Sequence, residues 1–302
     1  LYRHLKEKLT QFYKIDKKDV KLDEDGIANF PDLELINLST HVLPCYRLRR
    51  INRIKNGNGG KSKKRKVIVT TQLIEAGVDI SVDIVYRDFA PLDCLIQTAG
   101  RCNRNSERDK GYVNVVILRD KKRELYKYIY DSTLIDATID TIETFGEIVE
   151  EKDFILNSIN KYYKTILERG SKDDSRGILE SIIRLDFSKT AEFDLIQEKL
   201  PTMSLFVEID EVAEEIRKKM EKIMDSKKGF ERDLEILDIK REMNNYTLQI
   251  RCSEELENTV CTLNPIDGLE DYRYIERDEL DKYYKIDLGL DLGEESRKAL
   301  ML

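Results

Sequence analysis

Two short apolar runs limit the possible folds of this chain most strongly. Residues 67–71 (VIVTT) are rich in β-branched side chains, and such a run is typical of a parallel strand that is buried on both faces. A second run, residues 84–86 (IVY), follows a connection that is too short for a full helical crossover. We expect this connection, residues 72–79, to form one turn of helix and a loop at the carboxyl end of a strand. Ligands of open α/β sheets bind at those ends.

A helix is predicted from Pro91 to Gly100. Proline favours the first turn of a helix, and apolar residues recur at helical spacing along one face of this segment. If the helical turn persists at Gly100, it should place Gln97, Arg101 and Arg104 along one edge. Two neighbouring guanidiniums with no acid beside them need an anionic partner, and phosphate suits their fork geometry best.

These segments resemble known helicase motifs. Residues 70–80 (TTQLIEAGVDI) and 97–104 (QTAGRCNR) resemble motifs V and VI of superfamily 2 helicases, in which T-x-x-x-x-x-G-x-D precedes Q-x-x-G-R-x-x-R. Together with the intervening YRDFAPLD, they resemble more narrowly the large helicase of type I CRISPR interference, a helicase-nuclease. The close match extends from about residue 36 to residue 118.

The resemblance implies a fold in two parts. Residues 1–146 are expected to form the second RecA-like lobe of the motor, an α/β parallel-sheet lobe with motifs IV, V and VI. The order strand, helix, strand, strand, helix, strand agrees with one such lobe. Residues 147–302 are expected to form a mixed α+β, largely helical C-terminal accessory domain, in which no motif indicates a chemistry. A long helical stretch, broken near Ser132, is predicted for residues 121–145.

The resemblance also implies nucleotide-binding roles for five residues. Arg104 is expected to be the arginine finger of ATP hydrolysis and Arg101 its companion on the γ-phosphate, while Gln97 helps to place the phosphate or the attacking water. Gly77 would permit a close backbone approach. Asp79 would contact the ribose or orient an arginine, and its alternative role is that of a loop cap.

The other half of an ATP site is missing from the sequence. There is no D-E-x-H box, and Gly60-Lys61-Ser62 imitates the end of a P-loop but lacks its first glycine and precedes a strand. Neither His4 nor His41 is followed by Asp, so no HD nuclease motif is present. By resemblance, ATP with Mg²⁺ is expected to need a first RecA-like lobe that supplies the P-loop and the Mg²⁺ ligands. The isolated chain is therefore expected to be inactive.

Four polar residues are expected to contact nucleic acid at the ends of two strands. Ser39 and Thr40 follow the predicted strand at residues 33–38, and by resemblance to motif IV they could hold a phosphate. The alternative is that they cap the next helix. Thr71, with Gln72, is implied to contact the DNA backbone.

Charge is distributed unevenly along the chain. The net charge is -7, yet residues 41–66 contain ten Lys or Arg and no acid. A basic stripe on an acidic protein is typical of a groove that follows a phosphate backbone, so Arg49 and Arg53 are predicted to bind nucleic acid. The helix at residues 44–55 is expected to point its arginines outward, which leaves a merely solvated face as the alternative. Its core residues are predicted to be Leu48, Ile51 and Ile54.

The cysteines and the lack of targeting signals indicate where the protein is expected to be located. Five cysteines without a C-x-x-C pair indicate reduced thiols in a cytoplasmic protein, and neither a signal peptide nor an apolar run of ~18 residues is found. The first residue lies inside an apparent helix and is not Met, so a fragment of a longer protein is expected.

The resemblance implies an ATP-dependent motor that moves 3′ to 5′ on single-stranded DNA in antiviral defence. Its implied partners are single-stranded DNA, the first RecA-like lobe, an HD nuclease domain or subunit, and the crRNA-guided surveillance complex. Two alternatives remain open at this stage. One is another superfamily 2 helicase that acts on DNA or RNA, and the other is a non-catalytic scaffold that binds nucleic acid.

Overall fold

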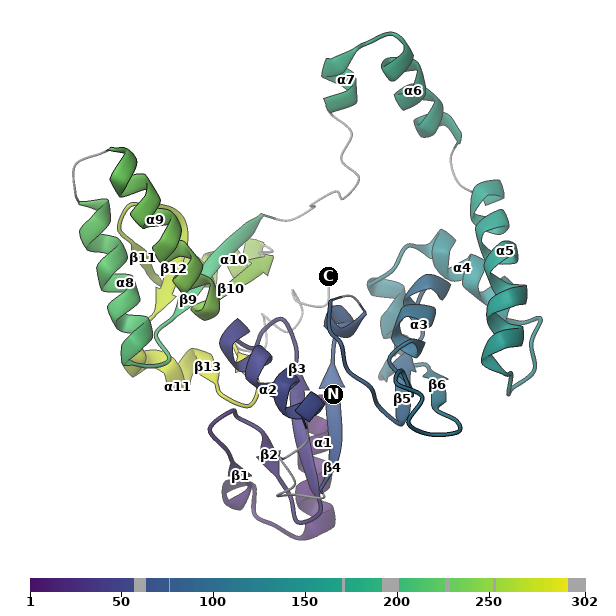
Figure 1. The fold of residues 1–302 in the computed structure, drawn as a ribbon, viewed down its shortest axis with the longest axis horizontal. Coiled ribbons are helices and arrows are strands. Elements are labelled where there is room, and N and C mark those ends of the chain that lie inside the picture. The colour runs from purple at the N-terminus through teal and green to yellow at the C-terminus, as the bar shows by residue number, and fades with distance from the viewer. Residues whose placement is uncertain are drawn as a thin grey trace. The chain divides into compact units, whose positions relative to one another are not determined.

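The computed structural model of the chain contains two compact units (Figure 1). Unit 1 comprises residues 1–80 and 200–302, and unit 2 comprises residues 81–199. The structure describes residues 1–56, 64–75, 77–169, 172–191, 201–225, 229–251 and 254–292. The Gly60-Lys61-Ser62 segment lies outside these ranges.

The first sheet of unit 1 has the order β1-β2-β3-β4. Strand β3 pairs antiparallel with β2 and parallel with β4, which is the edge strand. The parallel pair is in register from Leu33 and Arg65 to Leu38 and Thr70. Alternate residues of β3 point to opposite faces, so Leu35 packs with α1 in one core and Ile36 packs with α2 in another. The elements are α1 (Tyr2–Tyr13), β1 (Lys21–Leu22), β2 (Ala28–Asn29), β3 (Leu33–Leu38), α2 (Pro44–Asn56) and β4 (Arg65–Thr70).

The second sheet of unit 1 comes from the C-terminal part of the chain, in the order β10-β9-β12-β11. Helices α8 and α9 cover one face around Phe206, while the other core contains Leu205 together with Val42, Leu43 and residues of β10 and α10. The elements are β9 (Thr202–Val207), α8 (Glu211–Met224), α9 (Phe230–Met243), β10 (Thr247–Arg251), α10 (Glu254–Cys261), β11 (Asn264–Ile266), β12 (Leu269–Ile275), α11 (Leu280–Tyr283), β13 (Tyr284–Lys285) and β14 (Gly289–Leu290).

Unit 2 contains a second parallel pair, β5 beside β6. Helix α3 follows β5, and its Leu92 packs with Ala137 of α4 and Tyr162 of α5 in one core. Asp131 caps α4 by accepting hydrogen bonds from the Thr133 and Leu134 N–H groups. The elements are β5 (Ile84–Asp88), α3 (Leu92–Ala99), β6 (Tyr112–Val116), β7 (Arg119–Asp120), β8 (Arg123–Glu124), α4 (Ser132–Ile142), α5 (Glu151–Arg169), α6 (Lys172–Ile183) and α7 (Phe187–Ala191).

The predicted fold class is confirmed, since both units pair parallel strands or mixed sheets with packed helices. Two local predictions were wrong. Strand β4 is only half-buried along most of its length. The first half of residues 121–145 is not a long helix, because the chain reverses at Lys121 (φ 56°) into the β7–β8 hairpin and a short 3-10 turn, Leu125–Tyr128.

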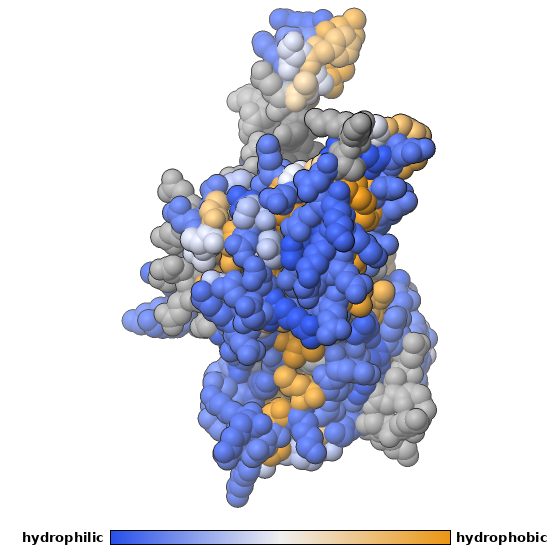
Figure 2. Space-filling model, turned by 90° about the vertical axis from the view of Figure 1, so that its left-hand side faces the viewer, coloured by the Kyte–Doolittle hydropathy of each residue, from blue (hydrophilic) through white to orange (hydrophobic). Residues whose placement is uncertain are grey.

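The two compact units do not divide at residue 146, because the C-terminal sheet belongs to the same unit as β3 and β4. The division into residues 1–146 and 147–302 as functional domains stays a prediction. Figure 2 shows a largely hydrophilic surface broken by hydrophobic patches. Within the described ranges, none of the helices is both long and apolar enough to cross a membrane. Among the residues that the structure describes, Cys45, Cys94, Cys102 and Cys261 form no disulfide bond.

Candidate functional site

Four of the predicted nucleic-acid-binding residues lie together at one edge of unit 1. Parallel strands end on the same side of a sheet, and the Thr71 N–H donates to the carbonyl oxygen of Leu38 (3.4 Å), so β3 and β4 end side by side. Ser39 and Thr40 follow the first strand, and Thr71 and Gln72 follow the second. Thr40, Thr71 and Gln72 are exposed, and Ser39 is half-buried. The edge therefore presents hydroxyl and amide groups to solvent.

The helix-cap alternative for Ser39 and Thr40 is wrong. Residues 39–43, which we call the β3 loop, form a turn in which the Val42 N–H donates to the Ser39 carbonyl oxygen (3.1 Å). Helix α2 begins only at Pro44. An N-cap residue directly precedes the first helical residue, so both hydroxyls lie too early in the chain for this role.

The loop after β4 presents Gly77 and Asp79 to solvent. Gly77 has φ +76°, a conformation strained for other residues, and beyond its two chain neighbours no atom of the described residues lies within 4 Å of the position of an added Cβ. The neighbouring Val78 and Ile80 are buried and anchor the loop beneath. Asp79 lies 3.6 Å from Lys55 Nζ, in a surface ion pair of small energetic worth. The backbone at Gly77 is therefore open to a ligand.

The predicted core face of helix α2 is confirmed at Ile51 and Ile54, which pack against two hydrophobic cores, and wrong at Leu48. Leu48 is 60% exposed, whereas the Arg50 side chain is fully buried. Arg50 donates hydrogen bonds to the carbonyl oxygens of Asp25 (2.8 Å), Asn37 (2.6 Å) and Ile286. The prediction that the arginines of this helix point outward was therefore wrong at Arg50, and sequence reasoning missed its structural role.

Arg53 also has partners inside the fold. It donates to Glu34 (2.9 Å), whose side chain is only 1% exposed, and lies 3.4 Å from Asp23. The hydrogen bond with Glu34 raises the pKa of Arg53. Arg49 differs, because its side chain is exposed and its guanidinium lies 5.5 Å from the Tyr46 ring centroid. Of the two predicted arginines, Arg49 is therefore the better placed to meet a phosphate backbone.

In unit 2, helix α3 ends at Ala99, before the two motif VI arginines. The next residues pair with the segment before β5: the Val82 N–H donates to the Arg101 carbonyl oxygen (3.0 Å), and the Asn103 N–H donates to the Val82 carbonyl oxygen (2.8 Å). Gln97 is exposed on the helix, Arg101 is half-buried and Arg104 is exposed. The Arg101 and Cys102 N–H groups still donate to carbonyl oxygens three residues back, but Asn103 has a positive φ and pairs with Val82. The helical turn therefore does not persist to Arg104, which was the condition for the expected common edge.

Asn103 organises the loop that contains Arg104. Asn103 has a positive φ of 47°, which asparagine tolerates better than most residues. Its side chain accepts from the Arg108 N–H (3.1 Å) and donates to the Arg108 carbonyl oxygen (2.7 Å). Arg108 in turn pairs with Asp83 (2.8 Å). The asparagine between the two arginines was the available signal for this turn, and sequence reasoning missed it.

The start of α3 is fixed by hydrogen bonds with side chains of α4 and α5. The Leu92 N–H donates to Thr138 Oγ1 (3.0 Å), and the Tyr162 hydroxyl donates to Asp93 (3.2 Å). Burial raises the pKa of Tyr162, which stays a neutral donor at physiological pH. Cys102 donates weakly to the Asp83 carbonyl oxygen, and burial raises the pKa of its thiol, which favours the unreactive protonated form. Both ends of the helix are thus fixed within unit 2.

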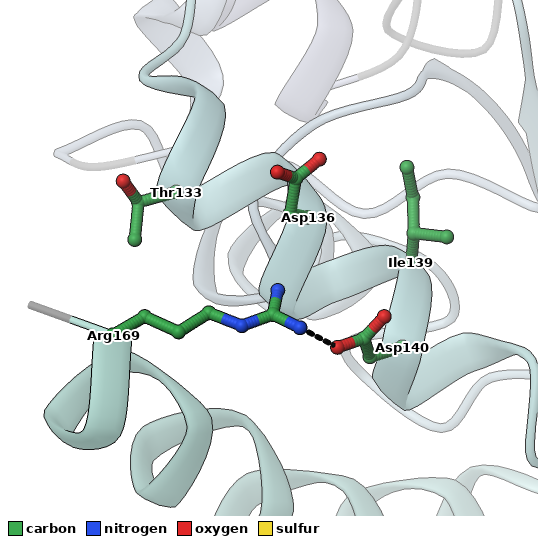
Figure 3. A pocket seen from close by; sticks show the side chains of 5 residues that line it. All are labelled: Thr133, Asp136, Ile139, Asp140 and Arg169. Carbon is green, nitrogen blue, oxygen red and sulfur yellow. Dashed lines mark hydrogen bonds and ion pairs between the residues drawn. The ribbon is translucent and has the colours of Figure 1, made fainter.

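A shallow pocket lies elsewhere in unit 2, between α4 and α5 (Figure 3). Arg169 reaches across it to Asp140 (2.5 Å), and Thr133, Asp136 and Ile139 complete the lining. None of the predicted site residues lines this pocket. We therefore take the strand edge and the motif VI loop as the candidate functional regions.

The comparisons agree with the motifs. Residues 20–107 match the family model described as CRISPR-associated nuclease/helicase Cas3, C-terminal. The chain is similar to the C-terminal part of Cas3. All the predicted site residues, from Ser39 to Arg104, lie within this matched region.

Individual Cas3 proteins give the same result. A CRISPR-associated nuclease/helicase Cas3 of Methanothermobacter thermautotrophicus is 33% identical over 156 residues, which are 45% of this chain and 18% of that protein. The Cas3 of Haloferax volcanii is 33% identical over 123 residues, 34% of this chain and 13% of that protein. The predicted resemblance to the large CRISPR helicase is confirmed, although the chain spans less than a fifth of these relatives.

The fold also matches. The crystal structure of T. fusca Cas3 with AMPPNP aligns with a TM-score of 0.55 and 16% identity, over 91% of this chain and 34% of that chain. The alignment extends well beyond the matched residues 20–107, so the likeness to the Cas3 fold includes the C-terminal part of the chain.

His41 on the β3 loop makes a first prediction possible. Burial lowers the pKa of His41 below its ordinary value of 6.5. The unfolded chain therefore binds more protons than the folded chain below that pH, and the free energy of unfolding falls as the pH falls through this range. We expect His41→Asn to flatten the decrease between pH 6.5 and 5 in denaturant unfolding curves. His4→Asn is the matched control, and an equal effect of both variants would contradict the assignment.

Proposed function

We propose that this chain supplies the second RecA-like lobe and the C-terminal domain of an ATP-dependent superfamily 2 DNA helicase that moves along single-stranded DNA in type I CRISPR interference. The observation that supports this most is the shared edge at the ends of β3 and β4. There Ser39, Thr40 and Thr71 stand next to the exposed Gly77 loop, within the region that matches the Cas3 family model.

The shared edge at the ends of β3 and β4 would bind nucleic acid through hydrogen bonds. Hydroxyl and backbone N–H groups contact phosphate oxygens without reading sequence, which suits a motor that must pass over any sequence. Ser39, Thr40 and Thr71 would hold successive phosphates, with Gln72 beside them. Arg49 would add a charge contact on the outer face of α2. We do not assign such a contact to Arg53, because Glu34 and Asp23 neutralise it.

The nucleotide would be ATP with Mg²⁺, shared with a first lobe that provides the P-loop and the Mg²⁺ ligands. Each unit by itself offers groups that fit a phosphate: unit 1 has the exposed Gly77 backbone, and unit 2 has exposed Arg104 on a loop closed by hydrogen bonds of Asn103. Bound ATP would supply the energy for movement by transfer of its γ-phosphoryl group to water. Arg104 and Arg101 would stabilise the charge that develops on the γ-phosphate, Gln97 would orient the phosphate or water, and Asp79 would contact the ribose.

The motor would act together with a nuclease on a strand displaced by the guide complex. The Cas3 relatives are named nuclease/helicases, so a nuclease of the HD type, in the same chain or in another, is the expected companion. The crRNA-guided complex displaces one strand of its target, and this single strand is the expected substrate. A helicase that acts on RNA would instead depend on the 2′-OH groups of its substrate.

Single-strand binding by the chain tests the proposed edge. The double substitution Ser39→Ala with Thr40→Val should weaken binding to a single-stranded DNA oligonucleotide about tenfold, because hydrogen bonds to a charged phosphate are lost. The dependence of affinity on salt should not change, since no cation is removed. Arg49→Gln is the contrasting variant, because it should reduce the slope of log K against log salt by about 0.7.

Fluorescence anisotropy over a range of salt concentrations measures both quantities. Unchanged affinity in the double variant would remove the β3 loop from the proposed interface. A matched RNA oligonucleotide, if bound more tightly than the DNA, would favour an RNA helicase. If the wild-type chain bound neither the DNA nor the RNA oligonucleotide at moderate salt, the proposal that this edge binds nucleic acid would be wrong.

A further inference from the structure

A short C-terminal segment of unit 1 packs across β3. This segment, residues 284–291, contains β13 and β14, and we call it the strap. Asn37 on β3 donates from its side-chain amide to the carbonyl oxygens of Asp287 (3.3 Å) and Leu288 (3.0 Å). Buried Arg50 adds a third hydrogen bond, to the carbonyl oxygen of Ile286. The strap is therefore attached to a strand about 250 residues earlier in the chain.

The strap also contacts the β3 loop directly. The Leu290 N–H donates to the carbonyl oxygen of His41 (2.9 Å), and the Leu43 N–H donates to the Tyr284 hydroxyl oxygen (3.1 Å). Leu43, Tyr284 and Leu290 are buried in the same core. These contacts lie within the turn that begins with Ser39, at His41, and directly after it, at Leu43. Asn37, just before the turn, binds the same strap, so the strap restricts the conformation of the turn from both ends.

Gly289 shows how closely the two segments approach. Its φ is +84°, and an added Cβ would lie only 2.2 Å from the carbonyl oxygen of His41. Atoms of the loop backbone cannot be moved aside as a flexible side chain can. Only glycine therefore permits both this backbone conformation and this distance, and a larger residue would push the β3 loop away from the strap.

We propose that the strap is a positioning device for nucleic-acid binding: Tyr284 and Gly289 hold the β3 loop in the conformation that presents Ser39 and Thr40 to a phosphate of single-stranded DNA. The inference rests on the proposed function of the β3 loop. The strap, although it lies in the C-terminal part of the chain, would then act within the motor lobe, since it belongs to the same compact unit as β3.

Two matched tyrosine variants test the proposal. Tyr284→Phe keeps the buried ring but leaves the Leu43 N–H without its acceptor. Tyr274→Phe is the control, because its hydroxyl donates to Glu276 (3.4 Å) at a different part of unit 1. We expect Tyr284→Phe to weaken single-stranded DNA binding about threefold to tenfold, with an unchanged salt slope, and to speed amide hydrogen exchange at Leu43. Tyr274→Phe should change none of these quantities.

Titration to saturation separates positioning from general destabilisation. A variant that is merely less stable loses active protein but keeps the wild-type Kd in the molecules that remain folded. Weaker binding at full stoichiometry would therefore support the proposal. Unchanged affinity in Tyr284→Phe, with or without faster exchange at Leu43, would overturn it.

A glycine pair provides a second test. Gly289→Ala should weaken binding at full stoichiometry, whereas Gly268→Ala, which has a similar φ of +79° but would contact the Met224 side chain, should not. Equal affinities in the two variants would overturn the proposal. Failure of the proposed function gives a different result: the Ser39 and Thr40 double variant would then bind like the wild type, while exchange at Leu43 would still report whether the strap holds the loop.

Discussion

Replacement of Arg104 by alanine is expected to lower DNA-stimulated ATP turnover about 10³-fold in a protein that contains both motor lobes. An arginine that stabilises charge on the transferred phosphoryl group is worth about 10³ to 10⁵ in rate. Arg104 is exposed, and the loop around it is closed by the two hydrogen bonds between Asn103 and Arg108. The side chain is therefore presented from an ordered backbone. Steady-state phosphate release, with and without single-stranded DNA, measures the effect.

Arg108→Ala is the matched control for Arg104. Arg108 lies in the same loop and is also exposed, but its side chain pairs with Asp83 and its loop contacts with Asn103 use the backbone. Its removal should change turnover by less than about threefold, because exposed ion pairs contribute little. Equal losses in both variants would mean that the loop matters only as a structure. Full activity in Arg104→Ala would show that this arginine is not the finger.

Local sequence patterns predicted many of the elements. The apolar run at residues 33–38 forms β3, and the helix predicted from Pro91 to Gly100 is α3, Leu92–Ala99, with those two residues as its caps. In both, the signal lies within the element: side chains alternate in a strand and recur every three or four residues in a helix. The spacing of motifs V and VI was likewise readable, because their glycine, acid and arginines lie close together in the chain.

Contacts between distant residues were not predictable in the same way. The acid-free stretch at residues 41–66 suggested a basic stripe, yet Arg53 and Arg65 are paired with Glu34 and Asp32 from the preceding strand and turn. A stretch without Asp or Glu in the sequence can still lie close to acidic residues in the fold, because neighbouring strands bring other segments alongside it. Arg49, Lys55 and Arg65 keep surface positions. Lys55 and Arg65 lie beside Asp79 and Asp32, whereas Arg49 contacts the Tyr46 ring.

The end of α3 shows the same limit. Arg101 and Arg104 were expected on one edge only if the helical turn persisted at Gly100, and Gly100 and Asn103 are both weak helix formers. The backbone of Arg101 and Asn103 pairs with Val82, before β5. The sequence could signal the end of the helix, but only the tertiary structure shows which segment the next residues pair with. The strap is a stronger case, since its contacts join residues about 250 positions apart.

Arg50→Met is expected to lower the free energy of unfolding of unit 1 by about 3 kcal/mol or more. Methionine fills much of the same space but offers no donor, so the carbonyl oxygens of Asp25, Asn37 and Ile286 would lose their hydrogen bonds. Each buried polar group left without a partner costs about 1–3 kcal/mol. Burial lowers the pKa of Arg50, and a guanidinium stays charged in folded proteins.

Arg49→Met is a control one residue away on the same helix. Arg49 is exposed, and its loss removes a cation–π contact worth about 0.5–1 kcal/mol. Urea unfolding followed by circular dichroism at neutral pH compares the two variants. Equal midpoints would show that Arg50 is not the buried connector of the β1–β2 turn, β3 and the strap. A large loss confined to Arg50→Met would show that this helix stabilises unit 1 through its buried arginine and leaves Arg49 for the surface.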